Sequence, residues 1–306
     1  MRYKIEKFPK ISVVTPSFNQ ADYLGETLAS VFDQRYPNLE YIVIDGGSTD
    51  GSVELIQAHA ERLAYWVSEK DEGQSQAINK GFAKATGDVI CWLNSDDVFL
   101  PGALNAVAYY FNANPDWEWV SGSSVKYGEG LHELTGFFEQ PKSRAEWLVH
   151  CPIIQPSTFW RRSLYEKFGG VDESFHFALD YEYWVRFVTG GVQMHFIDRP
   201  LSGYRLHDVS KTVAQSEKFL TEESRLREKH IGKLTSTEQS ELRRLLSKSA
   251  SVDELVRSVV LLNEGKVDEA RASVISVLKS SPGLLFTRTG AASLFRVMTN
   301  KPRYKS

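Results

Sequence analysis

Short apolar runs alternate with helix-spaced apolar residues through the first third of the chain. "ISVVT" from Ile11 is compact and β-branched, and Leu24, Leu28 and Val31 follow it at helical spacing. The same alternation returns in "YIVID", "AYWVSE" and "DVICWLN", each followed by a segment with helical periodicity. Strands that alternate with helices at this spacing predict an α/β fold, in which helices cover both faces of a mostly parallel sheet.

Beyond about residue 115 the pattern becomes mixed. We expect a strand at "EWVSGSSVKY", a helix at "PSTFWRRSLYEKFGG", a second helix at "LDYEYWVRFVTGG", and late strands at "MHFID" and "LSGYRLH". From about residue 215 the composition is helical and charged, with apolar residues at three- and four-residue steps. These shifts predict a main domain over residues 1–214 and a helical C-terminal appendage over residues 215–306.

The appendage has features of a single tetratricopeptide-like unit. Gly265 and Ala270 occupy small-residue positions, and Pro282 follows the second helical segment. Stable arrays need about three such units, so a plain helical hairpin packed on the main domain is the alternative.

Composition narrows the class of partner. With 42% hydrophobic and 25% charged residues in 306, the chain suits one substantial globular domain and an appendage. A net charge of -3 gives no reason to expect nucleic acid. Cys91 and Cys151 lie far apart without metal-type spacing, which favours reduced thiols in a cytoplasmic protein. No signal-peptide pattern and no run of about 18 apolar residues is present, so a membrane span is not expected.

Polar residues gather where the predicted strands end. "TPSFN", Asp45 with "GGSTDG", "KDEGQS" and "NSDD" each follow a strand, and open α/β sheets bind ligands beyond those ends. Adjacent residues of an extended segment point to opposite sides, so of Asp96 and Asp97 one should enter the crevice and the other hold the turn. Such a carboxylate can bind Mg²⁺ or Mn²⁺ together with phosphate oxygens. Alternatively, the pair only caps the helix that begins near Pro101.

Taken together and in order, these motifs resemble those of a known enzyme family. "VVTPSFNQADYLGETLASVFDQRYPNLEYIVIDGGSTDGS" and "DEGQSQAINKGFAKATGDVICWLNSDDVFLPGAL" resemble the nucleotide-binding half of a family 2 glycosyltransferase, a likeness that covers roughly residues 10–210. The resemblance implies the GT-A (Rossmann-like) fold. It also implies an inverting transfer of a sugar from a nucleoside-diphosphate donor, UDP-linked, to a hydroxyl of a glycan or lipid-linked acceptor in cell-surface polysaccharide synthesis.

The resemblance implies roles on the donor side. Thr15 and Pro16 would border the base, and Asp45 would bond its uracil-like edge. Asp71 and Ser95 complete the expected donor-binding residues. Asp96 would be the carboxylate of the DxD-type motif and, with His207 in "YRLHDVSKT", would hold Mn²⁺ or Mg²⁺, while Arg205 suits a phosphate.

The sequence departs from the family pattern at four positions. Asn94 replaces an Asp of the metal motif, Gly46 an Asp after Asp45, Ile78 an Arg before Asn79, and Leu179 a Glu before Asp180. The changes at Asn94 and Leu179, together with the helical appendage, make a catalytically inactive protein on this fold, acting in binding or as a scaffold, the alternative. A sugar nucleotidyltransferase should carry a Gly-rich basic loop after the first strand, and a glycoside hydrolase would not need the nucleotide-side motifs.

Asp180 matches the family's catalytic base. A carboxylate that takes the proton of the acceptor hydroxyl can contribute about 10²–10⁴-fold. The structural alternative is an N-cap for the helix through Trp184 and Val188. Trp160, Trp184 and Tyr181 would either stack on an acceptor sugar or, as is more common for aromatic residues at helical spacing, form core.

The segment 287–306 carries five basic residues and no acidic one. Leu294, Phe295, Val297 and Met298 cluster before its basic end. Such a segment can lie on an anionic membrane surface, at the inner face of the membrane, where a lipid-linked acceptor would be found. The alternatives are a helix packed on the appendage with a solvated tail, and an oligomer contact.

Overall fold

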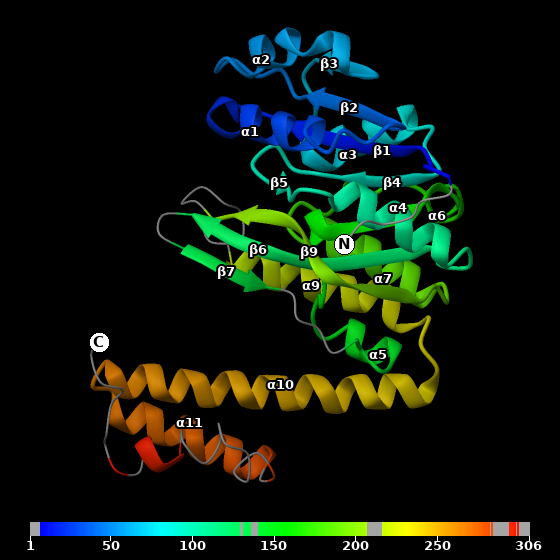
Figure 1. The fold of residues 1–306 in the computed structure, drawn as a ribbon. Helices are drawn as coiled ribbons and strands as arrows, with labels where there is room; N and C mark the ends of the chain where they lie inside the picture. Colours follow the sequence, from blue (N-terminus) through cyan, green and yellow to red (C-terminus); the bar gives the residue numbers. More distant parts are fainter. Residues whose placement is uncertain are drawn as a thin grey trace. The chain divides into compact units, whose positions relative to one another are not determined.

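The structure is a computed structural model that describes residues 7–128, 131–135, 140–206, 216–281, 283, 294–297 and 299. It divides into two compact units, Met1–Lys233 and Leu234–Ser306 (Figure 1). The boundary between the units lies after Lys233, beyond the boundary at residue 214 that the composition predicted. The helix Ser216–Ile231 therefore belongs to the first unit.

The first unit holds the described strands and most of the helices. Its strands are β1 (Ile11–Ser17), β2 (Leu39–Asp45), β3 (Tyr65–Ser68), β4 (Val89–Trp92), β5 (Val98–Phe99), β6 (Trp119–Gly128), β7 (Leu131–Thr135), β8 (Thr158–Arg161) and β9 (Met194–Arg205). Its helices are α1 (Ala21–Phe32), α2 (Ser52–Ala58), α3 (Gln74–Lys84), α4 (Ala103–Ala113), α5 (Arg144–Trp147), α6 (Arg162–Phe168), α7 (Leu179–Thr189) and α9 (Ser216–Ile231). Short 3₁₀ turns are η1 (Ala60–Arg62) and η2 (Gln155–Ser157).

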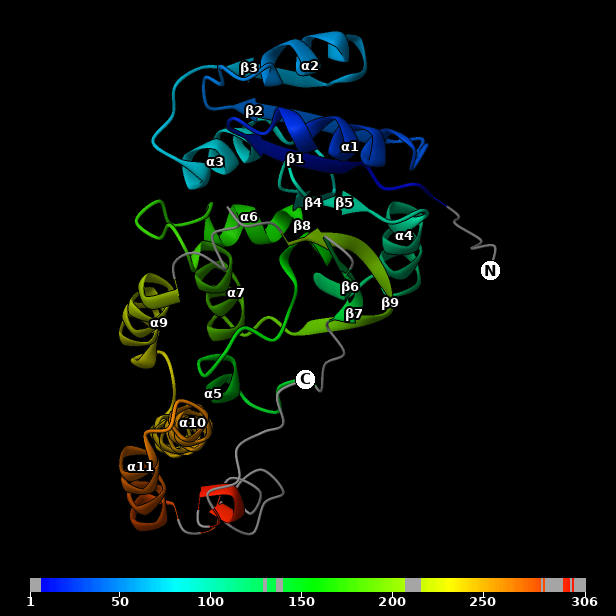
Figure 2. The ribbon, with the colours of Figure 1, turned by 90° about the vertical axis from the view of Figure 1, so that its left-hand side faces the viewer.

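The predicted α/β class is confirmed. The strands form one sheet in the order β3-β2-β1-β4-β8-β6-β9-β5, with β7 paired to β6. β1 to β4 are parallel to their neighbours in this part of the sheet, as predicted from the strand-helix alternation. Helices α1 and α4 lie on one face, and α3, α6 and α7 on the other (Figure 2). Beyond β4 the sheet is mixed, because β8 runs antiparallel to both β4 and β6.

Two local predictions were wrong. The segment "PSTFWRRSLYEKFGG" was expected to be one helix but forms η2, β8 and then α6. Thr158, Phe159 and Trp160 are all fully buried between β4 and β6, and a strand inside a sheet buries consecutive side chains on both faces. The two late strands are one strand, β9, whose pairing with β6 shifts register around Ser123.

Aromatic side chains form the centre of the first unit. Trp92 and Trp184 stack with ring centroids 5.5 Å apart, and Trp160 meets both rings edge-on. Trp160 and Trp184 are fully buried, and the hydroxyl of the buried Tyr181 donates to the carbonyl of Trp147 at 2.6 Å. These rings are therefore core, so the alternative of a sugar-stacking surface is wrong for them.

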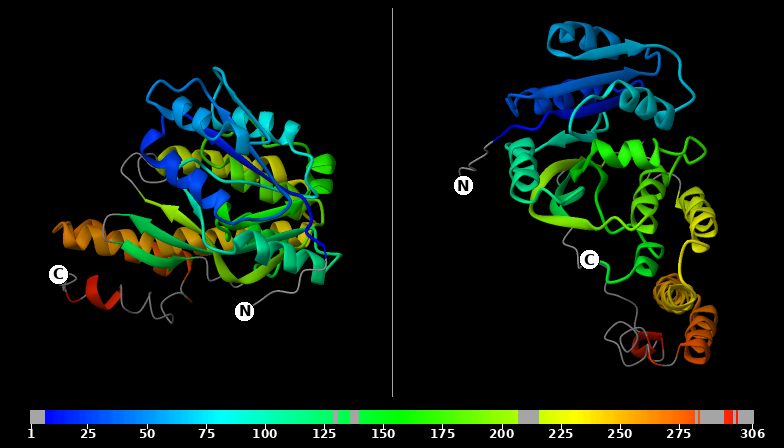
Figure 3. Two further views of the ribbon diagram at one scale, coloured as in Figure 1. Left: turned by 45° about the horizontal axis from the view of Figure 1, so that its top comes forward. Right: turned by 90° about the vertical axis from the view of Figure 1, so that its right-hand side faces the viewer.

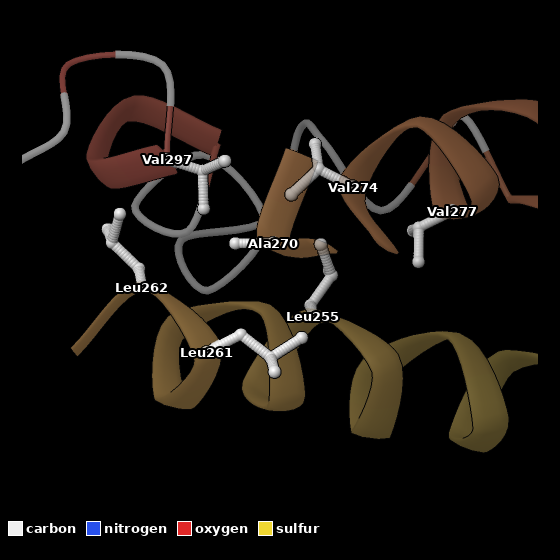
Figure 4. Packing of buried hydrophobic residues seen from close by; sticks show 7 residues of the cluster. All are labelled: Leu255, Leu261, Leu262, Ala270, Val274, Val277 and Val297. Atoms are coloured by element: carbon white, nitrogen blue, oxygen red, sulfur yellow. The ribbon is translucent and has the colours of Figure 1, made fainter. Parts of the chain in front are cut away.

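The second unit is built on α10 (Ser236–Asn263) and α11 (Val267–Ser280), which pack side by side (Figures 1 and 3). Thr235 and Glu238 form a capping box at the start of α10, and Gly265 takes the left-handed φ of +80° that ends it. The core of this unit is a cluster of seven buried residues, namely Leu255, Leu261, Leu262, Ala270, Val274, Val277 and Val297 (Figure 4). Whether this unit is tetratricopeptide-like stays a prediction.

The C-terminal segment contributes to that core. Val297 is fully buried in it and Leu294 packs against it, whereas Phe295 is 61% exposed. This burial supports packing on the appendage, while the basic residues from Lys301 onward lie outside the described residues. No described helix is long and apolar enough to span a membrane.

Candidate active site

Strands β1, β2 and β3 end at one edge of the sheet. Their register pairs Ser17 with Asp45 and Asp45 with Ser68, so the loops that follow start next to one another. The next strand, β4, joins them through Leu93, whose N–H donates to the carbonyl of Val14 at 2.9 Å. The four polar strand ends of the sequence therefore meet at one edge, where open α/β sheets bind their ligands.

Asp45 is fully buried and holds the turn that follows it. Its carboxylate accepts four hydrogen bonds, from the N–H groups of Gly47 and Ser48 and from the hydroxyls of Ser48 and Ser68, at 2.5–3.0 Å. Both carboxylate oxygens are thus used inside the protein. A contact between Asp45 and a base stays a prediction.

The loop after β1 exposes an aromatic ring that the sequence analysis missed. Thr15 and Pro16 are buried, and the Thr15 hydroxyl lies 3.0 Å from that of Tyr41. Phe18, two residues beyond Pro16, is 58% exposed. Asn19 has a positive φ of 50° and bonds the loop after β2, donating its N–H to Ser48. The sequence signal that could have identified Phe18 is its position as an aromatic residue directly after a predicted strand.

The carboxylate of Asp71 lies beside Gly46. A Cβ at Gly46 would lie 2.7 Å from Oδ2 of Asp71, which is closer than real Cβ contacts. Oδ1 of Asp71 accepts the N–H of Gly73 at 2.9 Å. The loop after β3 thus places a carboxylate next to position 46.

Asp96 and Asp97 lie in different environments. Asp97 is 1% exposed, and its Oδ1 accepts the N–H of Arg205 at 3.0 Å. Burial and the charge of Asp96 raise the pKa of Asp97 well above its usual range. Asp96 is half-buried beside it. Neither carboxylate caps α4, whose N-cap is Gly102 without a side-chain hydrogen bond, so the capping alternative is wrong.

The loop of the two aspartates is anchored from several elements. The hydroxyl of Thr27 donates to the carbonyls of Ser95 and Asp97 at 2.9 and 2.8 Å. The guanidinium of Arg205 donates to the carbonyl of Asp96 at 3.1 Å and pairs with Glu26. Its charge lies over the rings of Tyr23 and Tyr127, with 4.9 and 4.5 Å to their centroids. Arg205 therefore supports this loop through contacts within the protein.

Asn94 uses both ends of its amide. Its Oδ1 accepts a hydrogen bond from Gln74 at 2.8 Å, while its Nδ2 lies 3.5 Å from Oδ2 of Asp97 and 3.4 Å from Oε1 of Gln155. A carboxylate at this position would lack the donor that these two oxygens face. The departure from an aspartate at position 94 therefore has a structural reason.

The donor set at this edge fits a hard divalent cation that a ligand helps to hold. Within the described part of the chain no three His, Cys, Asp or Glu side chains form a metal cluster. Asp96 supplies one carboxylate, and His207 lies outside the described residues. One or two carboxylates completed by phosphate oxygens are a common arrangement for Mg²⁺.

Asp180 lies in the first turn of α7, two residues after the N-cap Ala178. Its Oδ1 accepts the N–H of Tyr181 at 2.8 Å, its own N–H also faces the carboxylate, and Oδ2 accepts no hydrogen bond from another described residue. Burial raises the pKa of Asp180 to about 6. The N-cap alternative is wrong, because the cap position is Ala178. Leu179 is 5% exposed and packs into the core.

Glu182, also in the first turn of α7, is fully buried and has a structural role. It pairs with Lys229 at 2.6 Å, with His230 at 3.0 Å and with Arg186 at 2.9 Å. Burial alone would raise its pKa, but the hydrogen bond from His230 and the charges of Arg186 and Lys229 lower it overall. Glu182 therefore joins α7 to α9.

Helix α3 connects the strand-end loops to the segment before Asp180. At its start Gln74 bonds Asn94, and the hydroxyl of Ser75 donates to the carbonyl of Phe175 at 3.0 Å. One turn later the amide of Asn79 donates to the carbonyl of Val171 at 3.0 Å. Ile78, between them, is fully buried. One helix thus fixes both candidate parts of the site.

Comparisons with known proteins agree with this geometry. Residues 12–169, just over half of the chain, match the family described as glycosyl transferase family 2. An uncharacterised glycosyltransferase of Mycobacterium tuberculosis is 36% identical over 187 residues, covering 58% of this chain and 68% of that protein. A putative teichuronic acid biosynthesis glycosyltransferase of Bacillus subtilis, TuaG, is 39% identical over 92 residues, which are 29% of this chain and 36% of that protein.

Solved structures share the fold. TarS 1–349 of Staphylococcus aureus in complex with UDP-GlcNAc aligns with a TM-score of 0.64 at 16% identity, covering 95% of this chain and 88% of that one. The mannosyltransferase PcManGT of Pyrobaculum calidifontis, in complex with GDP-Man and Mn²⁺, aligns with a TM-score of 0.62 at 17% identity, covering 98% and 90%. The GT-A fold is confirmed, and by its family match the chain belongs to glycosyl transferase family 2.

Proposed function

We propose that this glycosyltransferase moves a sugar from a UDP-linked donor to a hydroxyl of a growing glycan or a lipid-linked acceptor, with inversion at the anomeric carbon. The UDP-GlcNAc complex of TarS supports the donor class, and the teichuronic acid relative supports an acceptor in polysaccharide synthesis. The observation that carries the proposal is Asp180, a partly buried carboxylate with one oxygen held by an N–H and the other open within the described residues.

Asp180 performs the proton transfer. Its Oδ2 accepts the proton of the acceptor hydroxyl while that oxygen attacks the anomeric carbon and the bond to the diphosphate breaks. A pKa near 6 leaves the carboxylate ionised at neutral pH and still basic enough to take the proton. Attack from the face opposite the leaving group in one displacement gives inversion.

The strand ends bind the donor. The exposed ring of Phe18 offers a stacking surface for the base, and Asp71, beside Gly46, offers a carboxylate for its polar edge. Thr15, Pro16, Asp45 and Ser95, which are buried, support these strand ends from within. Asp96, with His207, would hold the cation. When bound, Mn²⁺ or Mg²⁺ supplies a Lewis acid that stabilises the charge of the leaving diphosphate.

Calorimetry of UDP binding tests the donor side. With Mn²⁺ we expect wild type to bind UDP, and we expect binding to weaken strongly when EDTA removes the metal. Asp96→Ala should lose this difference and keep its melting temperature, because the side chain is half-buried at a loop. Asp116→Ala, an exposed carboxylate after α4, is the matched control. Equal UDP affinity of Asp96→Ala and wild type in Mn²⁺ would remove Asp96 from the metal site.

Turnover decides between an enzyme and a scaffold. Wild type with Mn²⁺ and a panel of UDP-sugars should release UDP, by transfer or by slow hydrolysis. UDP binding without any turnover of the panel would favour the catalytically inactive alternative.

A further inference from the structure

Three successive N–H groups before α7 point to one carboxylate from another helix. Glu222, on α9, accepts hydrogen bonds from the N–H groups of His176, Phe177 and Ala178 at 2.9, 2.8 and 2.8 Å. Ala178 is the N-cap of α7, so Glu222 caps this helix from 44 residues away in sequence. The first N–H groups of a helix lack partners within it, and a carboxylate is a favourable partner for them.

This capping is usually done by a side chain of the helix's own N-terminus. Asp180 is a carboxylate in that first turn, and a side chain there can reach back toward the N-cap N–H, which is that of Ala178. In this structure Glu222 occupies the three N–H groups instead, and among the other described residues only Tyr181 donates its N–H to Asp180, whose own N–H also faces the carboxylate. The two carboxylates therefore divide the available donors between them.

Helix α9 holds Glu222 firmly in this place. Lys229 pairs with Asp172 and with Glu182, both at 2.6 Å. Arg225 donates to the carbonyl of Ser174 at 2.9 Å. These contacts fix α9 both to the segment that precedes α7 and to α7 itself. The position of Glu222 is thus set by contacts other than its own.

We propose that Glu222 is a positioning residue for the base: by capping α7 from α9, it fixes the segment before Asp180 and leaves Oδ2 of Asp180 to take the acceptor proton. This inference rests on the proposed function, because it gives Glu222 a role only if Asp180 is the base. It also makes α9 part of the catalytic unit, although α9 lies beyond the motifs that identify the family.

Two substitutions of Glu222 test it. Glu222→Ala frees the three N–H groups, which can then turn to Asp180 and draw its second oxygen away from the acceptor. Misplacement of a catalytic group by about 1 Å can cost about 10²-fold, so we expect turnover of a UDP-sugar to fall by about that factor. Glu222→Gln keeps one acceptor oxygen and should recover part of the loss. UDP binding in Mn²⁺ should stay within about twofold of wild type, because the strand ends are unchanged.

The pH profile separates positioning from mere stability. Hydrogen bonds to a carboxylate favour its charged form, so in Glu222→Ala the pKa of Asp180 should fall and the acidic limb of turnover should move to lower pH. The titratable group that interacts with Asp180 is Cys151 after α5, and Cys151 in turn feels Glu223 on α9, which interacts with Arg227 and His150. These groups are present in wild type and in both Glu222 variants, so their effects on the pKa of Asp180 cancel when the pH profiles are compared.

A control variant and the melting temperature distinguish a positioning role of Glu222 from a purely structural one. Glu228→Gln, an exposed carboxylate on the same helix, should match wild type. The inference is overturned if both Glu222 variants turn over like wild type. It is also overturned if turnover falls together with the melting temperature while the acidic limb stays in place, since that is a purely structural effect. If wild type itself neither binds UDP nor releases it from a donor, the proposed function fails, and this inference fails with it.

Discussion

Asp45 in the turn after β2 and Asp180 in the first turn of α7 are both carboxylates withdrawn from water, but the protein treats them differently. Asp45 accepts four hydrogen bonds, and both of its oxygens are used by the turn. Asp180 accepts one from another residue, that of Tyr181, and its Oδ2 accepts none from another described residue. Burial with full hydrogen bonding makes a carboxylate a structural group.

Burial with incomplete hydrogen bonding has another consequence. Desolvation penalises the charged form of Asp180, the backbone N–H groups of Tyr181 and of Asp180 itself offset this only in part, and its pKa rises to about 6. A buried carboxylate with few hydrogen bonds lowers the stability of the folded state and is a stronger base than an exposed one. Both properties are common in catalytic carboxylates. Removing each carboxylate should therefore produce opposite effects on stability and on turnover.

The largest effect is expected for turnover in Asp180→Asn. The amide preserves the shape of the side chain but cannot accept the proton, so turnover should fall by about 10²–10⁴-fold. UDP binding in Mn²⁺ should be unchanged. Steady-state rates with a UDP-sugar, compared with those of Asp198→Asn on the exposed surface of β9, measure this. Turnover at the wild-type rate would show that another group is the base.

A smaller effect, on stability, is expected for Asp45→Ala. The substitution leaves the N–H groups of Gly47 and Ser48 and the hydroxyl of Ser68 without their partner, at a cost of about 2–4 kcal/mol. Urea unfolding should show the loss as a lower midpoint. Asp180→Asn, studied in parallel, should be no less stable than wild type at neutral pH. Equal destabilisation of the two variants would contradict the distinction between these carboxylates.

The smallest expected effect in the comparison of Asp45 with Asp180 is on the pH dependence of stability. The folded-state pKa of Asp180 is about 6, above its ordinary value of 3.8. Between these values the unfolded chain releases a proton that the folded chain keeps, so this group's contribution to stability falls as the pH rises and is constant above about pH 6. Asp180→Asn lacks this titration. Its stability relative to wild type should therefore increase across this window, by up to about 3 kcal/mol.

Unfolding by urea at about pH 4.5 and about pH 7.5 measures this difference. Asp198→Asn, which is exposed, is the control and should show no such trend. A constant difference between Asp180→Asn and wild type across the window would mean that the carboxylate is not destabilised by burial.

The N-terminal half of the site was predictable from local pattern. The apolar runs that become β1 to β4 and the polar residues that end them lie next to one another in sequence, so strand ends and candidate ligands could be read together. Asp96 and Asp97 differ in environment as predicted, but Asp96 lies in a turn and not in the extended segment on which that prediction rested. Phe18 also follows a predicted strand directly and could have been identified in the same way, but it was missed.

The half that holds Asp180 was less predictable, because its structure depends on distant contacts. The buried run Thr158–Trp160 was read as helix, since periodicity alone does not show that β4 and β6 will enclose it. No local signal assigns α9 to the first unit, because that follows from its ion pairs with Asp172 and Glu182.

The sequence by itself determined the order of strands and helices from β1 to β4, the carboxylates at the strand ends and the family, because each depends on residues that are neighbours in sequence. Only the tertiary structure decided which carboxylates are saturated with hydrogen bonds and which are open. Hydrogen-bond partners and burial come from segments far apart in the chain, such as Glu222 for the N–H groups before α7 and Ser68 for Asp45. The chemistry of an aspartate is set by those partners, and the residue type alone does not specify them.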